Sequence, residues 1–147
     1  NAGVLRGARD DFIGLNFDDV TKSFLVNAVG PMRVTRALLP NLRMAKAPKV
    51  INITSRMGSI DDNTSGGYYG YRMSKTALNM FNSSFSREFK DILAVVMHPG
   101  WVKTDMGGPS APTEIYDSVK GLLSVINSLS LKDSGRFVDF RGEGIKW

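Results

Sequence analysis

The stretch Val50-Ile51-Asn52-Ile53-Thr54-Ser55 is the part of the sequence that decides the fold. Its β-branched and apolar residues end in two hydroxyl side chains, which is typical of a buried strand that leads into a turn. The run Ile92-Leu93-Ala94-Val95-Val96-Met97 has the same character, and Gly135–Phe140 gives a third candidate strand. The sequence therefore predicts three short, mostly buried strands.

Long helical patterns separate these strands. The first covers residues 17–43, has two aspartates near its start, where they suit the helix dipole, and contains Pro31. The second covers residues 71–90 and repeats an apolar side chain every four positions, at Met73, Ala77, Phe81, Phe85 and Phe89. The third begins near Pro112 and runs to about Leu129. Because helices and strands alternate, we predict an α/β fold with a parallel sheet and right-handed crossovers.

Composition limits the classes of function. The chain has 147 residues, 42% of them apolar and 22% charged, which predicts one globular domain over residues 1–147. It has no cysteine and one histidine, so disulfides, thiolate metal sites and paired-histidine motifs are excluded and we expect no metal site. The longest apolar run has six residues, far fewer than the roughly 20 that a membrane span needs. We therefore expect a soluble, cytoplasmic protein with no membrane partner.

The net charge of +5 is unevenly distributed. Residues 33–49 contain five bases and no acid, a pattern that could indicate an anionic partner. However, Arg33, Arg36 and Arg43 lie toward the end of the first predicted helix, where cations suit the helix dipole, and apolar residues interrupt them. We expect no nucleic-acid partner.

Tyr71 and Lys75 are four residues apart on a predicted helix and so share one face. A free tyrosine has a pKa near ~10, and a nearby ammonium favours the phenolate, which would bring the pKa toward the range of a useful acid or base. The alternative interpretation is that Tyr71 and Lys75 form an ordinary solvent-exposed pair on the helix surface. Ser55 follows the strand at 50–54, at the edge where open α/β sheets bind ligands, although an ordinary serine at a strand end is also common.

Asn27 is informative because Pro31 lies four residues later. Proline has no N–H, so the Asn27 carbonyl loses its usual helical partner. An ordered water could replace that partner and, near a lysine, form a proton path; a purely structural kink is the alternative.

The segment His98-Pro99-Gly100-Trp101-Val102-Lys103-Thr104 follows the second strand directly. Pro99 and Gly100 turn the chain, which directs the backbone of Trp101 and Val102 and the hydroxyl of Thr104 toward a ligand. We interpret His98 as a packing or hydrogen-bonding residue, because no acidic residue that would orient it is evident nearby.

Together these pieces resemble the C-terminal portion of a short-chain dehydrogenase/reductase. The resemblance covers essentially the whole chain and rests on five motifs in family order: Asn1-Ala2-Gly3, Asn27, Ser55, the Tyr71/Lys75 pair, and Pro99-Gly100 with Val102 and Thr104. The stretches at 66–71 and 98–108 especially resemble the sniffer-type carbonyl reductases. The resemblance implies a partial Rossmann-type doubly wound parallel sheet whose N-terminal dinucleotide-binding half is missing.

The resemblance also implies a function, hydride transfer between NADP(H) or NAD(H), the former slightly favoured, and a carbonyl or alcohol substrate. Tyr71 would exchange the proton, Ser55 would hold the substrate oxygen, Lys75 would bind the nicotinamide ribose and lower the Tyr71 pKa, and the Asn27 carbonyl would hold a water. The Asn1-Ala2-Gly3 motif would line the cofactor, as would Pro99-Gly100 with Val102 and Thr104. Arg56, Trp101 and Met106 would border the substrate, under a loop from Asp105 to Pro112 that acts as a mobile lid.

The sequence departs from the family pattern because no glycine-rich phosphate loop occurs in it. We therefore expect a piece of a longer enzyme, with an unpaired apolar edge on the strand at 50–54. The competing hypothesis is a catalytically incompetent fragment that acts at most as an interaction module. A homo-oligomer through the Tyr71 helix is a further expectation.

Overall fold

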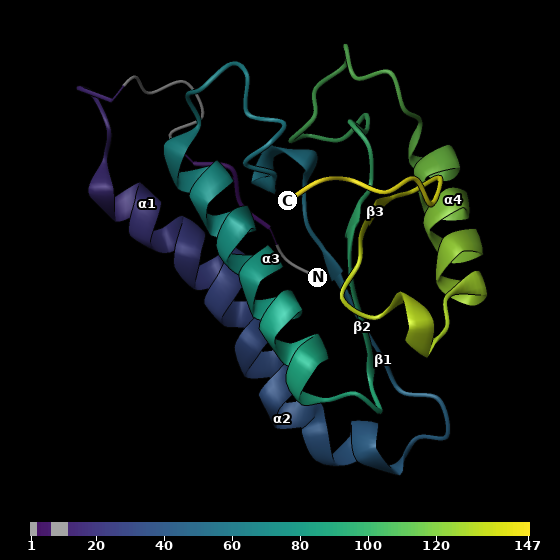
Figure 1. Ribbon diagram of the computed structural model, residues 1–147. Helices are drawn as coiled ribbons and strands as arrows, with labels where there is room; N and C mark the ends of the chain where they lie inside the picture. Colours follow the sequence, from purple (N-terminus) through teal and green to yellow (C-terminus); the bar gives the residue numbers. More distant parts are fainter. Residues whose placement is uncertain (1–2, 7–11) are drawn as a thin grey trace.

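The computed structural model describes residues 3–6 and 12–147 (Figure 1). Three strands, β1 (Lys49–Ile53), β2 (Leu93–His98) and β3 (Phe137–Asp139), form a sheet in the order β1-β2-β3. Both neighbouring pairs are parallel, with Ile51 opposite Val95 and Met97 opposite Val138. The predicted strands and the α/β class are confirmed, and in the described residues β1 lies at one edge of the sheet.

Helices cover both faces of the sheet (Figure 1). One layer contains α1 (Phe17–Phe24), the π-helical η1 (Leu25–Val29), α2 (Gly30–Met44) and α3 (Tyr69–Glu88). The other contains α4 (Ile115–Ser128), and two short 3-10 helices, η2 (Arg56–Gly58) and η3 (Leu131–Asp133), lie in connections. The alternating side chains of β2 pack into both layers, Val95 and Met97 with α4 and Ala94 with Phe85 of α3. This alternation explains why the run at 92–97 is apolar at every position.

The first predicted helix is divided where Pro31 interrupts it. Asn16 caps α1 by accepting from the backbone N–H of Asp18 at 2.9 Å. Further along, the Gly30 N–H donates to the Leu25 carbonyl five residues earlier, the pattern of a π-helix. A wider turn is one way in which a helix accommodates a proline that cannot donate, so the predicted irregularity is present as η1.

The prediction of one apolar stripe along the Tyr71 helix is wrong for its first half. Met73 is 50% exposed, and the buried face carries polar side chains instead, including Ser74, Lys75, Asn79 and Asn82. The two asparagines are buried because they bond the sheet. Asn82 accepts from the Asn52 amide at 3.2 Å and donates to the Ala94 carbonyl at 3.2 Å. The C-terminal part of the stripe, Phe81, Phe85 and Phe89, packs as predicted.

Candidate functional site

Ser55 lies at the carboxyl end of β1, where the chain turns into η2. Its backbone is extended, and its Oγ accepts from the Met57 N–H at 3.2 Å, which caps the short helix. The Gly58 N–H donates to the Ser55 carbonyl at 2.8 Å. Both contacts hold the buried Ser55 at the edge of the sheet that the sequence predicted.

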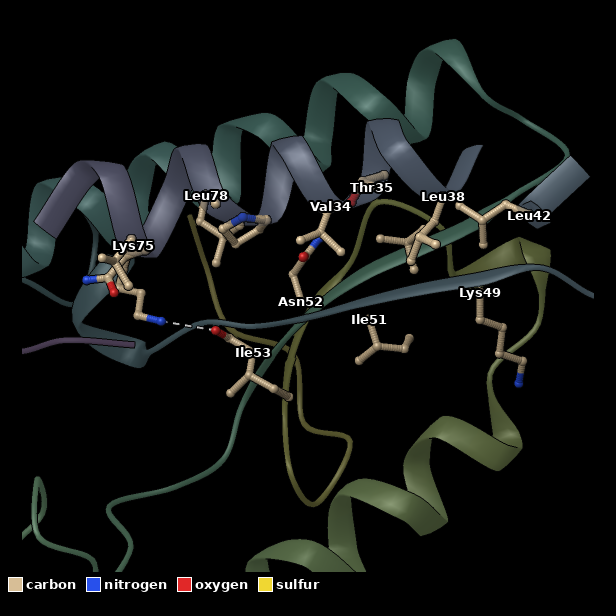
Figure 2. Close-up of a pocket in the computed structure, with 15 residues that line it drawn as sticks. Val34, Thr35, Leu38, Leu42, Lys49, Ile51, Asn52, Ile53, Lys75 and Leu78 are labelled. Carbon is tan, nitrogen blue, oxygen red and sulfur yellow. Dashed lines mark hydrogen bonds between the residues drawn. The ribbon is translucent and has the colours of Figure 1, made fainter. Parts of the chain in front are cut away.

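Helix α3 brings Tyr71 and Lys75 to the same place. The Tyr71 phenol interacts with the Ser55 side chain, and the Lys75 Nζ lies 5.8 Å from the centre of the Tyr71 ring. The Lys75 ammonium donates to the Ile53 carbonyl at 3.0 Å (Figure 2). All three side chains are buried. The structure thus gathers a hydroxyl, a phenol and an ammonium at the end of one strand.

The ionisation of this cluster differs from the sequence expectation. Burial raises the pKa of Tyr71 above its ordinary value, and the hydrogen bond with Ser55 opposes this rise. Burial also lowers the pKa of Lys75 to about 8. The expected lowering of the Tyr71 pKa is therefore absent in the chain by itself, because desolvation penalises both charged forms and the Lys75 ammonium is bonded to a backbone carbonyl instead.

The lowered pKa of Lys75 predicts how stability depends on pH. The folded state releases this proton near pH 8, whereas the unfolded chain keeps it until about pH 10.5, so the unfolded state binds more protons between these values. The Lys75 contribution to the free energy of unfolding therefore rises with pH across this window. Urea unfolding from pH 7.5 to 9.5 should show a rise that is absent in Lys75→Met, and equal slopes for both proteins would contradict a buried, destabilised ammonium.

The Asn27 side chain connects the N-terminal segment to α3. Its amide accepts from the Val4 N–H and donates to the Val4 carbonyl, both at 2.9 Å, and donates to the Ser74 Oγ at 3.0 Å. Ser74 in turn donates to the Tyr71 carbonyl at 2.8 Å. Sequence reasoning assigned a role to the Asn27 carbonyl and missed this role of the side chain.

The Asn1-Ala2-Gly3 motif is described only at Gly3, because Asn1 and Ala2 lie outside the described residues. A Cβ added to Gly3 would lie 3.7 Å from both the Asn27 Oδ1 and the Lys75 Nζ. The N-terminal motif therefore reaches the same cluster, although it lies some 70 residues from Lys75 in the sequence.

The segment after β2 forms a closed loop rather than an open one. Val102 and Thr113 form a β-bridge at its base, and the Trp101 Nε1 donates to the Gly107 carbonyl at 2.7 Å. The Gly107 N–H donates to the Thr104 hydroxyl at 3.2 Å, so this hydroxyl also stabilises the loop. At the start of the loop Gly100 has φ of +89°, and an added Cβ would lie 2.9 Å from the Phe140 ring. Only glycine fits this turn.

The side chains expected at the rim are exposed. Trp101 and Met106 are 56% and 46% accessible. Arg56 lies between two carboxylates, 3.9 Å from Asp62 and 4.0 Å from Asp139, and about half of its side chain is exposed. These positions leave all three residues available to a ligand at the sheet edge.

His98 ends β2 as an uncharged side chain. Burial, together with the nearby Arg56 guanidinium, lowers its pKa to about 4, although the Asp139 and Asp62 carboxylates oppose this. Its Nδ1 is buried without a hydrogen-bond partner among the described residues. At neutral pH the imidazole is therefore not protonated, which agrees with its interpretation as a packing residue.

A buried polar network behind Ser55 was not predicted. The Thr54 hydroxyl donates to the Asn79 Oδ1 at 2.7 Å, and the Asn79 Nδ2 donates to the Gly58 carbonyl at 3.1 Å. The Thr76 hydroxyl donates to the same carbonyl at 2.9 Å. The sequence held one signal of this network, since Asn79 is four residues after Lys75 and therefore shares its helix face.

The described residues, 3–6 and 12–147, contain no group of three or more His, Asp or Glu side chains arranged to hold a metal ion. No helix in this part of the chain has the length and apolar content that a membrane crossing requires.

A parallel α/β sheet with a serine, a tyrosine and a lysine at its carboxyl edge defines a class of protein, and comparison of the sequence agrees. A sequence model described as short chain dehydrogenase matches residues 1–115. The chain belongs to the short-chain dehydrogenase/reductase family, and its structural likeness is to the sniffer-type members.

Individual relatives support this assignment. The chain is 48% identical over 135 residues to C-signal of Myxococcus xanthus, covering 90% of this chain and 81% of that protein. It is 36% identical over 144 residues to 1-hydroxy-2-glutathionyl-2-methyl-3-butene dehydrogenase of Rhodococcus sp. (strain AD45), covering 94% of this chain and 63% of the relative.

Solved structures agree over the full length of the chain. The carbonyl reductase Sniffer of D. melanogaster superimposes with a TM-score of 0.95 at 34% identity, and the NADPH-bound carbonyl reductase from chicken fatty liver with 0.92 at 35%. Both comparisons cover 100% of this chain and 64% of the solved chain. The chain thus spans just under two thirds of the length of these carbonyl reductases.

Proposed function

We propose that the chain is the catalytic portion, residues 1–147, of an NAD(P)-dependent oxidoreductase that reduces a carbonyl or oxidises an alcohol. One observation carries this proposal: the buried side chains of Ser55, Tyr71 and Lys75 gather at the carboxyl edge of a parallel sheet, with the Lys75 Nζ 5.8 Å from the centre of the Tyr71 ring. A protonated phenol at neutral pH is a proton donor, and burial keeps Tyr71 protonated.

Each of these side chains has a separate task in the reduction direction. Ser55 binds the carbonyl oxygen and orients it toward the Tyr71 hydroxyl. Tyr71 donates its proton to that oxygen as negative charge develops there. The Lys75 ammonium then stabilises the phenolate that remains, because a nearby cation favours the charged form of a tyrosine.

The residues present fit the nicotinamide end of a dinucleotide cofactor. Gly3 lies against Lys75 with no side chain between them, so the ribose hydroxyls could reach the ammonium from that side. Gly3 with Asn1 and Ala2, the Pro99-Gly100 turn, and the backbone of Val102 and Thr104 would hold the rest of this end. When bound, the nicotinamide supplies the hydride. NADP(H) is slightly favoured over NAD(H), since three of the similar solved structures are described with NADPH or NADP bound.

The substrate is a small carbonyl or alcohol compound bordered by Arg56, Trp101 and Met106. The loop from Asp105 to Pro112 would cover it, moving as one unit because the bridge between Val102 and Thr113 closes its base. Met73 and Met80 expose apolar surface on the outer side of α3, at 50% and 66%, and this surface would support a homo-oligomer through that helix.

A direct test measures cofactor binding and turnover together on the protein in its complete natural form. We expect NADPH fluorescence to report saturable binding, and steady-state assays to show reduction of an aromatic aldehyde or ketone. Measurements with NADH in parallel would establish the cofactor preference. Absence of both binding and turnover in a monodisperse, folded sample would contradict the proposal.

A second candidate is an interaction module without catalysis. The relative C-signal, of which the chain spans 81%, is named for a signal and not for a reaction. Size-exclusion chromatography and an NADPH titration of the 147-residue chain separate the two functions. Binding of a macromolecular partner without any affinity for NADPH would favour the module.

A further inference from the structure

A polar cavity lies between the C-terminal half of α3 and the segment that leads into β3. Its volume is about 450 Å³, within the range of about 300 to 1,000 Å³ that small-molecule sites occupy. β3 is the edge of the sheet opposite to β1. Ser83, which lines the cavity, lies roughly 18 Å along α3 from Tyr71, since each helical residue adds about 1.5 Å. The cavity is therefore separate from the proposed active site.

One stripe of polar side chains on α3 forms a wall of this cavity. Ser83, Ser86 and Arg87 line it, together with Lys90 just after the helix. Their spacing of three and four residues places them on one helix face. The Ser86 hydroxyl donates to the Ser83 carbonyl at 2.9 Å, whereas the Ser83 hydroxyl makes no hydrogen bond within the described part of the chain. The wall thus offers a free hydroxyl beside two cations.

The opposite wall is held in place by β2. The Gly135 N–H donates to the Ala94 carbonyl at 2.7 Å, and the Ser134 Oγ accepts from the Ala94 N–H at 3.1 Å. Both Ser134 and Gly135 line the cavity. A Cβ added to Gly135 would lie 3.0 Å from the Ser86 Oγ, so this segment packs closely against α3. The sheet and the helix therefore fix the shape of the cavity before any ligand arrives, as in most small-molecule sites.

Trp147 adds an aromatic surface to the cavity. Its ring packs against the buried ring of Phe137, with the centroids 5.5 Å apart. Its backbone carbonyl accepts from the Asp61 N–H at 3.1 Å. The side chain lines the cavity and remains 45% exposed. An indole held in this way can stack on a planar ring of a ligand.

The charge of the cavity is positive. Arg87 and Lys90 have no ion pair among the described residues, and none of those that line the cavity is acidic. Asp133 is bonded to Arg136 at 2.9 Å and lines a different cavity. Cations near a helix C-terminus also suit the helix dipole, but the dipole does not explain why a free hydroxyl and an exposed indole lie beside them. Arginine, lysine and hydroxyl groups are the side chains with which proteins bind phosphate.

We propose that this cavity binds the phosphate monoester of an aromatic compound. Arg87 and Lys90 hold the phosphate, and the Ser83 hydroxyl donates to one of its oxygens. Trp147 stacks on the aromatic ring. Aryl phosphates and nucleoside monophosphates share this chemistry. The site goes beyond the proposed reductase function and does not depend on it, because none of its residues belongs to the cluster of Ser55, Tyr71 and Lys75.

The test is an NMR titration of the complete natural protein, labelled with ¹⁵N, with phenyl phosphate. The Trp147 indole N–H and the Gly135 amide report on the cavity, whereas the Trp101 indole N–H reports on the proposed active site. Spectra of Trp147→Leu and Trp101→Phe assign the two indole signals. We expect saturable shifts at Trp147 and Gly135. Adenosine monophosphate, titrated in parallel, shows whether a nucleotide or a simpler aryl phosphate is preferred at the same signals.

Charge variants test the phosphate contacts. Arg87→Gln and Lys90→Gln should each weaken phenyl phosphate binding by about tenfold or more, the effect of losing one hydrogen bond to a charged group. Ser83→Ala should weaken it by about threefold to tenfold, the effect of losing an ordinary one. The matched control combines Arg33→Gln with Arg36→Gln, which removes two exposed charges from α2. It should leave the affinity unchanged at physiological salt, where charges more than about 8 Å apart are screened.

Fragments of the ligand test the aromatic contact. Phenol carries the ring without the charge and should cause no saturable shift. Inorganic phosphate should bind about tenfold more weakly than phenyl phosphate, because a stacked ring contributes an effect of that order. Trp147→Leu should abolish this difference, since leucine can still cover Phe137 but has no aromatic face. Unchanged amide signals elsewhere would confirm that this variant is folded.

The outcomes separate a built site from general attraction of anions. Saturable shifts at Trp147 and Gly135 that are lost in the Arg87 and Lys90 variants support the proposal. Equal affinity for inorganic and phenyl phosphate overturns it, as does an equal loss in the α2 control. Shifts confined to Trp101, or none up to about 10 mM, tenfold above a millimolar Kd, also overturn it. Turnover is not measured here, so failure of the proposed reductase activity would be seen separately.

Discussion

Tyr71→Phe is expected to lower kcat for carbonyl reduction by roughly 100- to 10,000-fold, the range in which a positioned general acid contributes. The substitution removes only the hydroxyl and leaves the ring that packs beside Lys75. Binding of NADPH should change little, because the ammonium and the N-terminal motif remain. Steady-state kinetics with an aromatic aldehyde, together with a fluorescence titration of NADPH, measure the two effects separately.

Tyr69→Phe is a matched control for this substitution. It removes the same hydroxyl two residues away, from a side chain whose ring contacts Phe12 and which makes no described contact with Ser55. We expect near-normal turnover in this variant. If Tyr71→Phe also retained most of its activity, Tyr71 would not be the proton donor and the proposed mechanism would be wrong.

The sheet could be predicted because its signals are local. The strands β1 and β2 are short apolar runs that contain β-branched residues, and the boundaries of all three strands differ from the prediction by no more than two residues. Ser55 could be placed at the carboxyl edge because it directly follows such a run. Tyr71 and Lys75 could be placed together because helix periodicity alone puts residues four apart on one face.

The polar interior of α3 could not be predicted from the same periodicity. Asn79 and Asn82 are buried because their amides reach Thr54 and Asn52, which are 25 and 30 residues away in the sequence. Pairings at this separation depend on how the helix lies on the sheet, which a local pattern does not contain. A search for apolar spacing therefore selected Met73, on the exposed side of the helix.

The pKa shifts of Tyr71 and Lys75 could not be predicted from the sequence for a related reason. The spacing of Tyr71 and Lys75 indicates that they can interact, but not which other group each contacts. Lys75 donates to the Ile53 carbonyl, and burial outweighs the expected attraction in setting the pKa of both Tyr71 and Lys75. Desolvation is a property of the packed structure and has no sequence signature.

Gly58→Ala is expected to destabilise the fold by about 1–3 kcal/mol, the usual cost of inserting a methyl group into a packed interior. Gly58 lies in η2 directly against α3, where an added Cβ would come within 2.9 Å of the Lys75 Cβ and 3.0 Å of its backbone carbon. Neither atom belongs to the flexible end of a side chain, so η2 and α3 must separate. Urea unfolding followed by circular dichroism measures the loss.

In Gly58→Ala, the separation of η2 and α3 should also lower activity, by more than the loss of stability explains. Gly58 follows Ser55 by three residues, and the methyl group would push on the helix that carries Tyr71, so the distance between the two side chains must change. A displacement of about 1 Å in such a site can reduce turnover by on the order of 100-fold.

Gly144→Ala is the matched control, because an added Cβ there meets no atom within 4 Å. We expect both stability and kcat to be nearly unchanged in Gly144→Ala. Equal behaviour of the two variants would show that η2 can move without disturbing Ser55, and the close packing of Gly58 against Lys75 would then not be what positions the site.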